Sequence, residues 1–210
     1  MQFSARFSGW MTALLLGLWV VVPSVIDIVT SEQFNRAATP RPAVVPELEL
    51  TAHTGAVVTQ ADLPGQPTAV FFGFTHCPDV CPTTLQDITR WLDELGSQGL
   101  DMQVWFITLD PERDTRTALA AYLEAFSSQI LGLTGEPAAI ERAAGSFSAY
   151  RRKVSLGDDA TQYTLDHTAS IYLFDRSGRF QDLIAFGEQD AFALNKLRKL
   201  VAHPDQPPAG

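Results

Sequence analysis

The chain has 210 residues, of which 46% are hydrophobic and 19% charged, and its net charge is −9. This composition is typical of a globular protein with enough residues for one sizeable domain. We find no basic stripe, so nucleic acid is not an expected partner. Two cysteines in a chain of this length do not make a disulfide scaffold, which favours redox or metal chemistry for them.

The first predicted element is a membrane anchor. Residues 9–26 contain no charged side chain, a length that suits a spanning helix and exceeds the usual core of a signal peptide. We place the cytoplasmic N-terminus at residues 1–8, the transmembrane anchor at 9–29 and an extended, proline-containing linker at 30–46. Arg6 precedes the segment and acidic residues follow it, which favours translocation of the rest of the chain. A cleaved signal peptide is the alternative.

Strand and helix signals alternate through residues 47–202, the predicted folded domain. The expected strands are 48–51, 56–59, 68–74, 102–109, 130–133, 170–174 and 179–185, with hairpins at the first and last pairs. The first expected helix carries Leu85, Ile88, Leu92 and Leu95 at helical spacing and ends at Gly96. The other expected helices span 115–126, 137–147 and about 189–201. In the last helix, Phe192, Leu197, Leu200 and Val201 are predicted to point inward. The tail at 203–210 is predicted to be disordered. This order predicts an α/β, thioredoxin-like fold, an analogy that says little about the reaction.

Both cysteines lie in the turn between a buried strand and a helix, in the stretch Phe74-Thr75-His76-Cys77-Pro78-Asp79-Val80-Cys81-Pro82. If Cys81 lies in the first helical turn, unpaired backbone N–H groups and the helix dipole favour its thiolate. Two thiolates at this spacing can close on a metal or on each other. The pattern alone leaves metal binding and redox chemistry open.

Two further stretches carry possible chemistry. The loop 109–115 follows the second core strand and therefore lies at the same sheet edge as the cysteines, with Asp110 the residue expected to face the site. For Arg113, Asp114 and Thr115, helix capping and local pairing are equally good explanations.

The second stretch contains Asp166 and His167, just before the closing hairpin. In a thioredoxin-like fold, His167 is expected in a loop beside the cysteine turn. Cys77, Cys81 and His167 then form a three-ligand set that suits Cu(I), and that holds Cu(II) or Zn(II) with an extra ligand. Asp166 is a candidate to orient a partner group.

The chain resembles the Sco/SenC family in Phe72–Leu85, Thr108–Asp114, Gly132–Gly135 and Asp166–Leu173. The cysteine stretch is specific as a whole string, and the layout of anchor, linker and domain matches too. The resemblance implies a membrane-tethered, thioredoxin-like copper protein that helps assemble the dinuclear copper centre of cytochrome c oxidase. It also implies Cys77, Cys81 and His167 as the copper ligands, for Cu(I), Cu(II) or both.

The other histidines are weaker candidates. His76 adjoins Cys77, but neighbouring side chains diverge, so direct ligation is not the favoured interpretation. His53, in a predicted hairpin turn, and His203, in the tail, are interpreted as ordinary surface residues.

The main hypothesis is a copper metallochaperone in the inner membrane, with its folded domain in the periplasm. Its expected partners are the copper-bearing oxidase subunit, an upstream copper donor and a thiol reductant. The alternative is a thiol–disulfide oxidoreductase that uses Cys77 and Cys81 to reduce the cysteines of the oxidase copper site. A peroxidase on the same fold is weaker still, because the cysteine stretch contains no arginine and Arg113 is distant in sequence.

Overall fold

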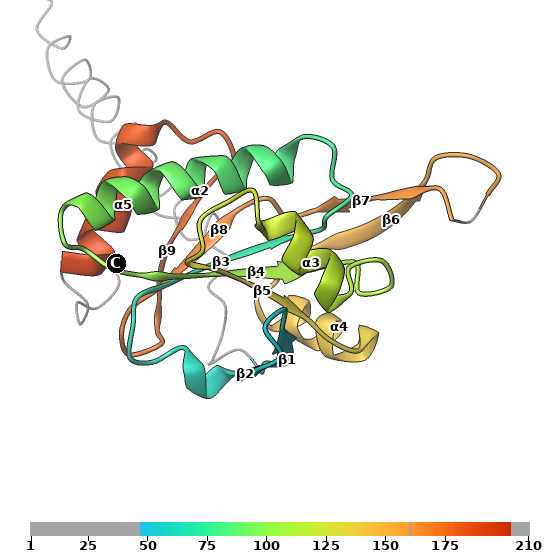
Figure 1. Cartoon of the computed structure of the whole chain (residues 1–210), viewed down its shortest axis with the longest axis horizontal. Coiled ribbons are helices and arrows are strands. Elements are labelled where there is room, and N and C mark those ends of the chain that lie inside the picture. Colours follow the sequence, from blue (N-terminus) through green and yellow to red (C-terminus); the bar gives the residue numbers. More distant parts are fainter. Residues whose placement is uncertain (1–46, 160, 203–210) are drawn as a thin grey trace, which may run out of the picture. The chain divides into compact units, whose positions relative to one another are not determined.

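The computed structural model describes residues 47–159 and 161–202. The strands within them are β1 (Glu49–Ala52), β2 (Val57–Thr59), β3 (Thr68–Gly73), β4 (Gln103–Thr108), β5 (Ile130–Thr134), β6 (Arg151–Ser155), β7 (Tyr163–His167), β8 (Ile171–Phe174) and β9 (Phe180–Ile184). The helices are the 3-10 helix η1 (Gln60–Asp62), α2 (Val80–Ser97), α3 (Arg116–Leu123), α4 (Pro137–Ser146) and α5 (Asp190–Ala202). Figure 1 shows their arrangement.

A seven-stranded sheet organises the domain, in the order β2-β1-β5-β4-β3-β8-β9. Inside it, β3 runs parallel to β4 and antiparallel to β8. Every residue of β3 is buried, as the continuous apolar run at 68–74 predicts for a strand covered on both faces. The two predicted hairpins are confirmed as β1–β2 and β8–β9.

Helices cover both faces of this sheet. Ala69 of β3 lines a small apolar cavity together with Leu92 of α2 and Leu197 of α5, so these two helices lie on one face. Phe72, three residues further along β3, points to the opposite face. There its ring centre lies 5.1 Å from that of Phe147, which directly follows α4. The hydrophobic core therefore fills both sides of β3.

The parallel pairing of β3 and β4 positions the chemistry. Because the two strands run in the same direction, their carboxyl ends meet at one edge of the sheet. The cysteine turn (residues 74–79) leaves β3 there, and the loop before α3 (residues 109–115) leaves β4. The sequence-based expectation that these two segments share an edge is confirmed.

The ribbon of β6 and β7 was not among the predicted elements. The two strands pair antiparallel with each other and form a separate two-stranded sheet, which projects from the side of the domain in Figure 1. Residues 151–155 read Arg-Arg-Lys-Val-Ser and lack the apolar alternation by which a strand is recognised. As a result His167, expected in a loop, is the last residue of a strand.

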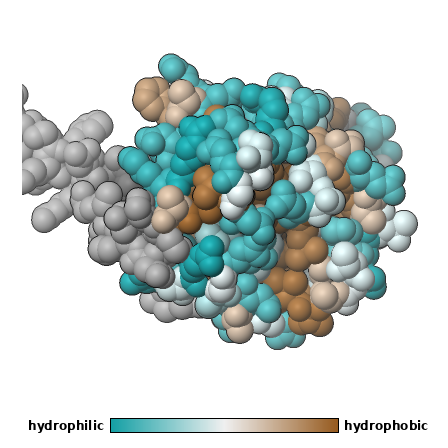
Figure 2. Space-filling view, turned by 60° about the vertical axis from the view of Figure 1, so that its left-hand side comes forward, coloured by the Kyte–Doolittle hydropathy of each residue, from teal (hydrophilic) through white to brown (hydrophobic). Residues whose placement is uncertain are grey.

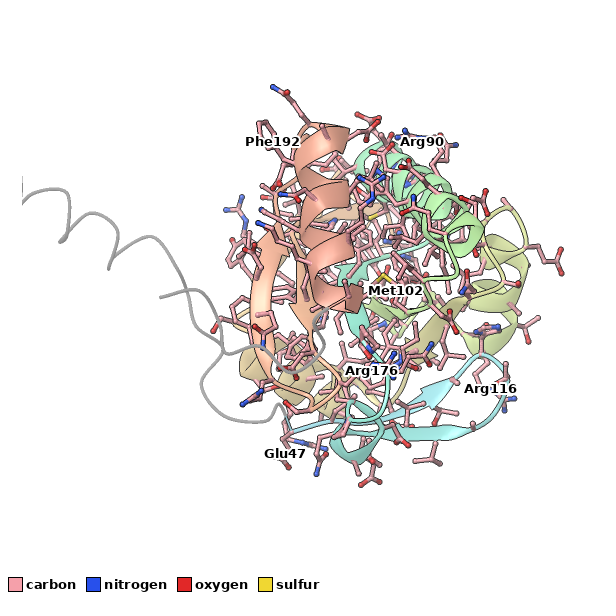
Figure 3. All side chains as sticks on the ribbon, turned by 90° about the vertical axis from the view of Figure 1, so that its left-hand side faces the viewer. Glu47, Arg90, Met102, Arg116, Arg176 and Phe192 are labelled. Carbon is pink, nitrogen blue, oxygen red and sulfur yellow. The ribbon has the colours of Figure 1, made fainter. Side chains whose placement is uncertain are left out.

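The prediction that Phe192 points inward is wrong. Its side chain is 59% exposed, and Figure 3 shows it directed away from the domain at the start of α5. Its neighbour Ala193 is fully buried instead, because the helical stripe that contains Leu197 and Leu200 passes through 193 and not 192. The helix expected at 115–126 is also shorter, ending at Leu123.

The face in Figure 2 is largely hydrophilic, with hydrophobic residues exposed in small groups. The predicted N-terminus, anchor and linker (1–46) and the tail (203–210) lie outside the described residues. In the part of the chain that the structure describes, no helix combines the length and the apolar character needed to cross a membrane.

Candidate metal centre

The cysteine turn is held close to the end of β3. The Cys77 N–H donates to the carbonyl oxygen of Phe74 at 3.2 Å, which folds the chain back toward the sheet before α2 begins at Val80. Cys81 thus lies in the first turn of α2, as predicted, and it is fully buried. Cys77 is only partly buried. The pair therefore presents one sulfur toward the surface and one toward the core.

Gly73 makes room for the buried sulfur. A Cβ at this position would lie 2.8 Å from the Cys81 Sγ and 2.7 Å from a ring carbon of Phe106. Both separations are too short for carbon, so a larger residue would displace the Cys81 side chain. The glycine at the end of the buried strand is thus part of the geometry of the site.

His167 reaches the cysteines from β7. Its Nε2 lies 3.5 Å from the Cys81 Sγ, and its Nδ1 lies 2.9 Å from the carbonyl oxygen of Thr168. A carbonyl oxygen can only accept, so Nδ1 carries the proton and Nε2 keeps its lone pair facing the sulfurs. The ring of Phe74 packs edge-on against the imidazole, with centres 5.7 Å apart, which restricts the imidazole's orientation.

Cys77, Cys81 and His167 come together as one cluster. One donor atom from each lies within 4.8 Å of the others. Two sulfurs and one imidazole nitrogen are a soft donor set, suited to copper or zinc. A bound metal ion would have these three atoms as its protein donors.

The two thiols differ sharply in acidity. The pKa of Cys77 is lowered to about 4, chiefly because the Cys81 side chain donates a hydrogen bond to its sulfur; the Cys81 backbone N–H also lowers it. The pKa of Cys81 is strongly raised by the same contact with Cys77, by burial and by the neighbouring negative charge. The expectation that the helix start favours a thiolate at Cys81 is therefore wrong. The Cys81 N–H instead points at the Cys77 Sγ, 3.3 Å away.

The two acidic candidates for the surroundings of the site have other immediate partners. Asp110 is 2% exposed; it accepts hydrogen bonds from Arg113 and from the Tyr163 hydroxyl. Asp166 lies on the outer face of the β6–β7 ribbon and pairs with Arg152. Neither carboxylate belongs to the cluster of Cys77, Cys81 and His167.

Asp114 has a structural role that its sequence position does not reveal. Its carboxylate is fully buried and accepts hydrogen bonds from the Thr75 N–H and from the Thr75 and Thr108 hydroxyls. Thr115, not Asp114, caps α3, by accepting from the Ala118 N–H. No sequence pattern marks this role, because it depends on the loop after β4 meeting the cysteine turn in space.

The remaining histidines lie apart from the cluster. His76 is exposed, and its Nδ1 lies 3.0 Å from the Thr75 hydroxyl and 3.8 Å from the Asp114 carboxylate. His53 is partly buried: its Nδ1 accepts from the Gly132 N–H at 3.0 Å, so it is more engaged than an ordinary surface residue. His203 lies outside the described residues.

Comparison with known proteins gives one consistent family. Residues 36–202 match the model of the family described as SCO1/SenC. The human Protein SCO1 homolog, mitochondrial, is 40% identical over 146 residues, which cover 68% of this chain and 48% of the relative. A SCO2-like protein of Rickettsia felis is 36% identical over 134 residues, or 64% of this chain and 65% of the relative. The chain thus spans about half to two thirds of the length of these relatives.

Solved structures of similar proteins point to the same family. Bradyrhizobium japonicum ScoI with copper bound is 40% identical, with a TM-score of 0.68, and the match covers 75% of this chain and 99% of that one. Yeast Sco1 with copper bound is 33% identical, with a TM-score of 0.67, covering 78% and 92%. The predicted mixed α/β, thioredoxin-like fold of the Sco type is confirmed.

Proposed function

The chain belongs to the SCO1/SenC family, and we propose that it is a copper metallochaperone that binds the metal through Cys77, Cys81 and His167. The observation that carries this proposal is the convergence of the three donor atoms within 4.8 Å of one another. Solved relatives at 40% and 33% identity are described as having copper bound. Two sulfurs and one nitrogen suit Cu(I), and Cu(II) with a further ligand.

The cluster also suits metal transfer. Only Cys81 is fully buried, while Cys77 and His167 are partly exposed, so an incoming ligand has access from the surface. Three protein ligands leave the metal open to a fourth, whereas a closed cage of four would hold it firmly. The proposed recipient is the copper-bearing subunit of cytochrome c oxidase, the family's client.

Redox state gates this binding. Joining Cys77 to Cys81 in a disulfide removes two electrons and two protons from the thiols, and neither sulfur is then a thiolate ligand. A thiol reductant must therefore act on the oxidised protein before an upstream donor delivers copper. We place the chain in the inner membrane through residues 9–29, with the folded domain in the periplasm, where thiols become oxidised.

The ligand set is tested by anaerobic titration of the reduced full chain with Cu(I), followed by X-ray absorption. We expect one copper per chain with two sulfurs and one nitrogen in its first shell. A shell made of sulfur alone would remove His167 from the ligand set.

The location is tested by asking whether the full chain stays in the membrane at alkaline pH and whether added protease reaches the domain from the periplasmic side.

A thiol–disulfide oxidoreductase is the second candidate, favoured by the low pKa of the partly exposed Cys77 beside a second thiol. The variant His167→Ala separates the two functions. Copper delivery collapses under the first, because only a weaker site of two sulfurs remains, whereas reduction of an oxidised, disulfide-bonded client peptide survives under the second. The peroxidase alternative loses support because the Arg113 guanidinium is engaged with Asp110 and the Tyr163 carbonyl oxygen.

A further inference from the structure

The loop between β4 and α3 contains two buried carboxylates that the copper chemistry does not use directly. We call residues 109–114 the aspartate loop. Asp110 is 2% exposed and Asp114 is fully buried. Buried carboxylates are costly unless donors surround them, so the identity of those donors shows what the loop holds in place.

Asp114 holds the cysteine side of the site. Its carboxylate accepts from the Thr75 N–H at 2.9 Å and from the Thr75 hydroxyl at 2.6 Å. Thr75 lies two residues before Cys77, in the turn that delivers both sulfurs. Hydrogen bonds to a charged, buried acceptor are the strong kind, so the turn is fixed to the loop at this point.

Asp110 holds the histidine side. Its carboxylate accepts from the Tyr163 hydroxyl at 2.8 Å, and it pairs with Arg113. The Arg113 guanidinium lies 3.7 Å from the centre of the Tyr163 ring and donates to the Tyr163 carbonyl oxygen at 3.1 Å. Nearby, Arg151 donates to the carbonyl oxygen of Leu109 at 2.7 Å. The loop thus forms hydrogen bonds with both strands of the β6–β7 ribbon.

The two halves of the loop are tied to each other. The Asp114 N–H donates to the Asp110 carbonyl oxygen at 2.8 Å. The Thr108 hydroxyl donates to the Asp114 carboxylate at 2.6 Å and accepts from the Asp110 N–H at 2.9 Å. A turn with this many internal hydrogen bonds acts as one rigid piece.

The β6–β7 ribbon depends on such contacts with the loop for its position. In the described residues β6 and β7 pair only with each other, so no ladder connects them to the main sheet. Tyr163, Leu165 and His167 alternate along one face of β7, and the first two are buried. Tyr163 and His167 lie about 13 Å apart along the strand. Arg151 is the direct partner of His167 across the ribbon. The contacts of the aspartate loop with Tyr163 and with Arg151 therefore both restrict the position of His167.

We propose that the aspartate loop sets the position of His167 relative to the two cysteines, with Tyr163 and Thr75 as positioning residues on its two sides. This inference rests on the proposed copper function. It gives the loop a role that sequence analysis left open: Asp110 serves the site through Tyr163 rather than by contact with a ligand.

Two isosteric changes test it in the reduced full chain, with Cu(I) affinity measured by competition against a chromophoric chelator. Tyr163→Phe removes only the hydroxyl that binds Asp110, and Thr75→Val removes only the hydroxyl that binds Asp114. We expect each to weaken Cu(I) affinity about tenfold, the usual scale for residues that orient metal ligands. X-ray absorption of the loaded Tyr163→Phe protein should show a weakened nitrogen contribution and unchanged sulfur.

The same changes in a His167→Ala background give the decisive comparison. Tyr163→Phe should have no further effect there, because the ribbon has no ligand left to position, whereas Thr75→Val should keep its full effect on the cysteines. Arg152→Gln is the matched control: Arg152 lies on the ribbon, is 64% exposed and pairs with Asp166, and its change should leave the affinity unaltered.

Two results would overturn the inference: an unchanged Cu(I) affinity for Tyr163→Phe, or an equal loss for that change with and without His167. Failure of the proposed ligand set would look different. It would appear as an unchanged affinity for His167→Ala alone, before any positioning residue is altered.

Discussion

The two sulfurs of the site differ although they are only four residues apart. Cys77 is partly exposed and accepts hydrogen bonds from its neighbours, which holds its pKa at about 4. Cys81 is fully buried beside Gly73, and its pKa is raised by Cys77 and by burial. A single proton on the pair therefore resides on Cys81, where it stabilises the Cys77 thiolate.

This asymmetry predicts the order of alkylation. In the reduced protein, iodoacetamide should modify Cys77 well before Cys81, because the thiolate is the nucleophile and Cys77 is the more accessible. Since the pKa of Cys77 is about 4, its rate should be nearly constant between about pH 6 and pH 9 and fall as the pH approaches 4. An ordinary thiol, with a pKa near 8.5, would instead gain about tenfold per pH unit between about pH 6 and pH 8. Peptide mass mapping of quenched samples measures both rates, and faster modification of Cys81 would contradict the assignment.

Gly73 provides a second prediction at the scale of one residue. Gly73→Ala places a methyl group 2.8 Å from the Cys81 Sγ, so the sulfur or the ring of Phe106 must move. Overpacking of this kind typically costs about 1–3 kcal/mol of unfolding free energy, and we expect a loss of Cu(I) affinity with it. Urea unfolding and chelator competition measure the two effects. Gly145→Ala is the matched control, because nothing lies within 4 Å of the added methyl group there; a Gly73→Ala protein with both properties intact would refute the steric argument.

At the scale of elements, the sequence predicts the buried strands well and the ribbon poorly. The apolar run 68–74 reads as a covered strand because both faces of β3 are buried. β6 is mostly polar and exposed, so it carries no periodic signal, and its pairing with β7 comes from backbone hydrogen bonds. The error at Phe192 has a similar origin: one position in a helical stripe depends on how the helix is rotated.

The site shows the same division. The cysteine stretch and His167 can be predicted as site residues from residue type and family resemblance, although Cys81 and His167 are 86 positions apart in the sequence. The role of Asp114 in holding the cysteine turn cannot be predicted from the sequence, because the loop after β4 and the turn after β3 meet only through the parallel pairing of their strands. Contacts of this kind depend on tertiary structure and leave no local pattern.

The start of α3 separates stability from copper binding. Thr115 caps the helix by accepting from the Ala118 N–H at 3.2 Å, one residue beyond the aspartate loop. Thr115→Ala should lower the unfolding free energy by about 1 kcal/mol, while Cu(I) affinity stays at its normal value because the Asp114 carboxylate keeps its donors. Urea unfolding and chelator competition on the same samples test this. A tenfold loss of affinity here would show that helix stability, and not the aspartate loop, controls the site.

At the scale of the whole molecule, a copper ion at the proposed site would join segments that are far apart in the sequence. Cys77 lies in the turn before α2, Cys81 in the first turn of α2 and His167 at the end of β7. A shared ion would therefore cross-link the β6–β7 ribbon to the segment that follows β3. An ion that binds only the folded state adds its binding free energy to the stability of that state. The ligands come together only when the chain is folded, so copper binding and folding are coupled.

The consequence is a redox-dependent stabilisation by copper. For the reduced chain, free Cu(I) at a thousandfold excess over Kd should raise the unfolding free energy by about 4 kcal/mol, or the midpoint temperature by roughly 8–16 °C for a domain of this size. Oxidation to the Cys77–Cys81 disulfide should abolish this gain, because neither sulfur remains a thiolate. Cys77→Ser should also abolish it, while the control Arg152→Gln keeps it in full. Thermal unfolding under anaerobic conditions, with chelator-buffered Cu(I), measures each case. An equal shift for the reduced and oxidised chains would mean that copper binds elsewhere and that the two sulfurs do not gate it.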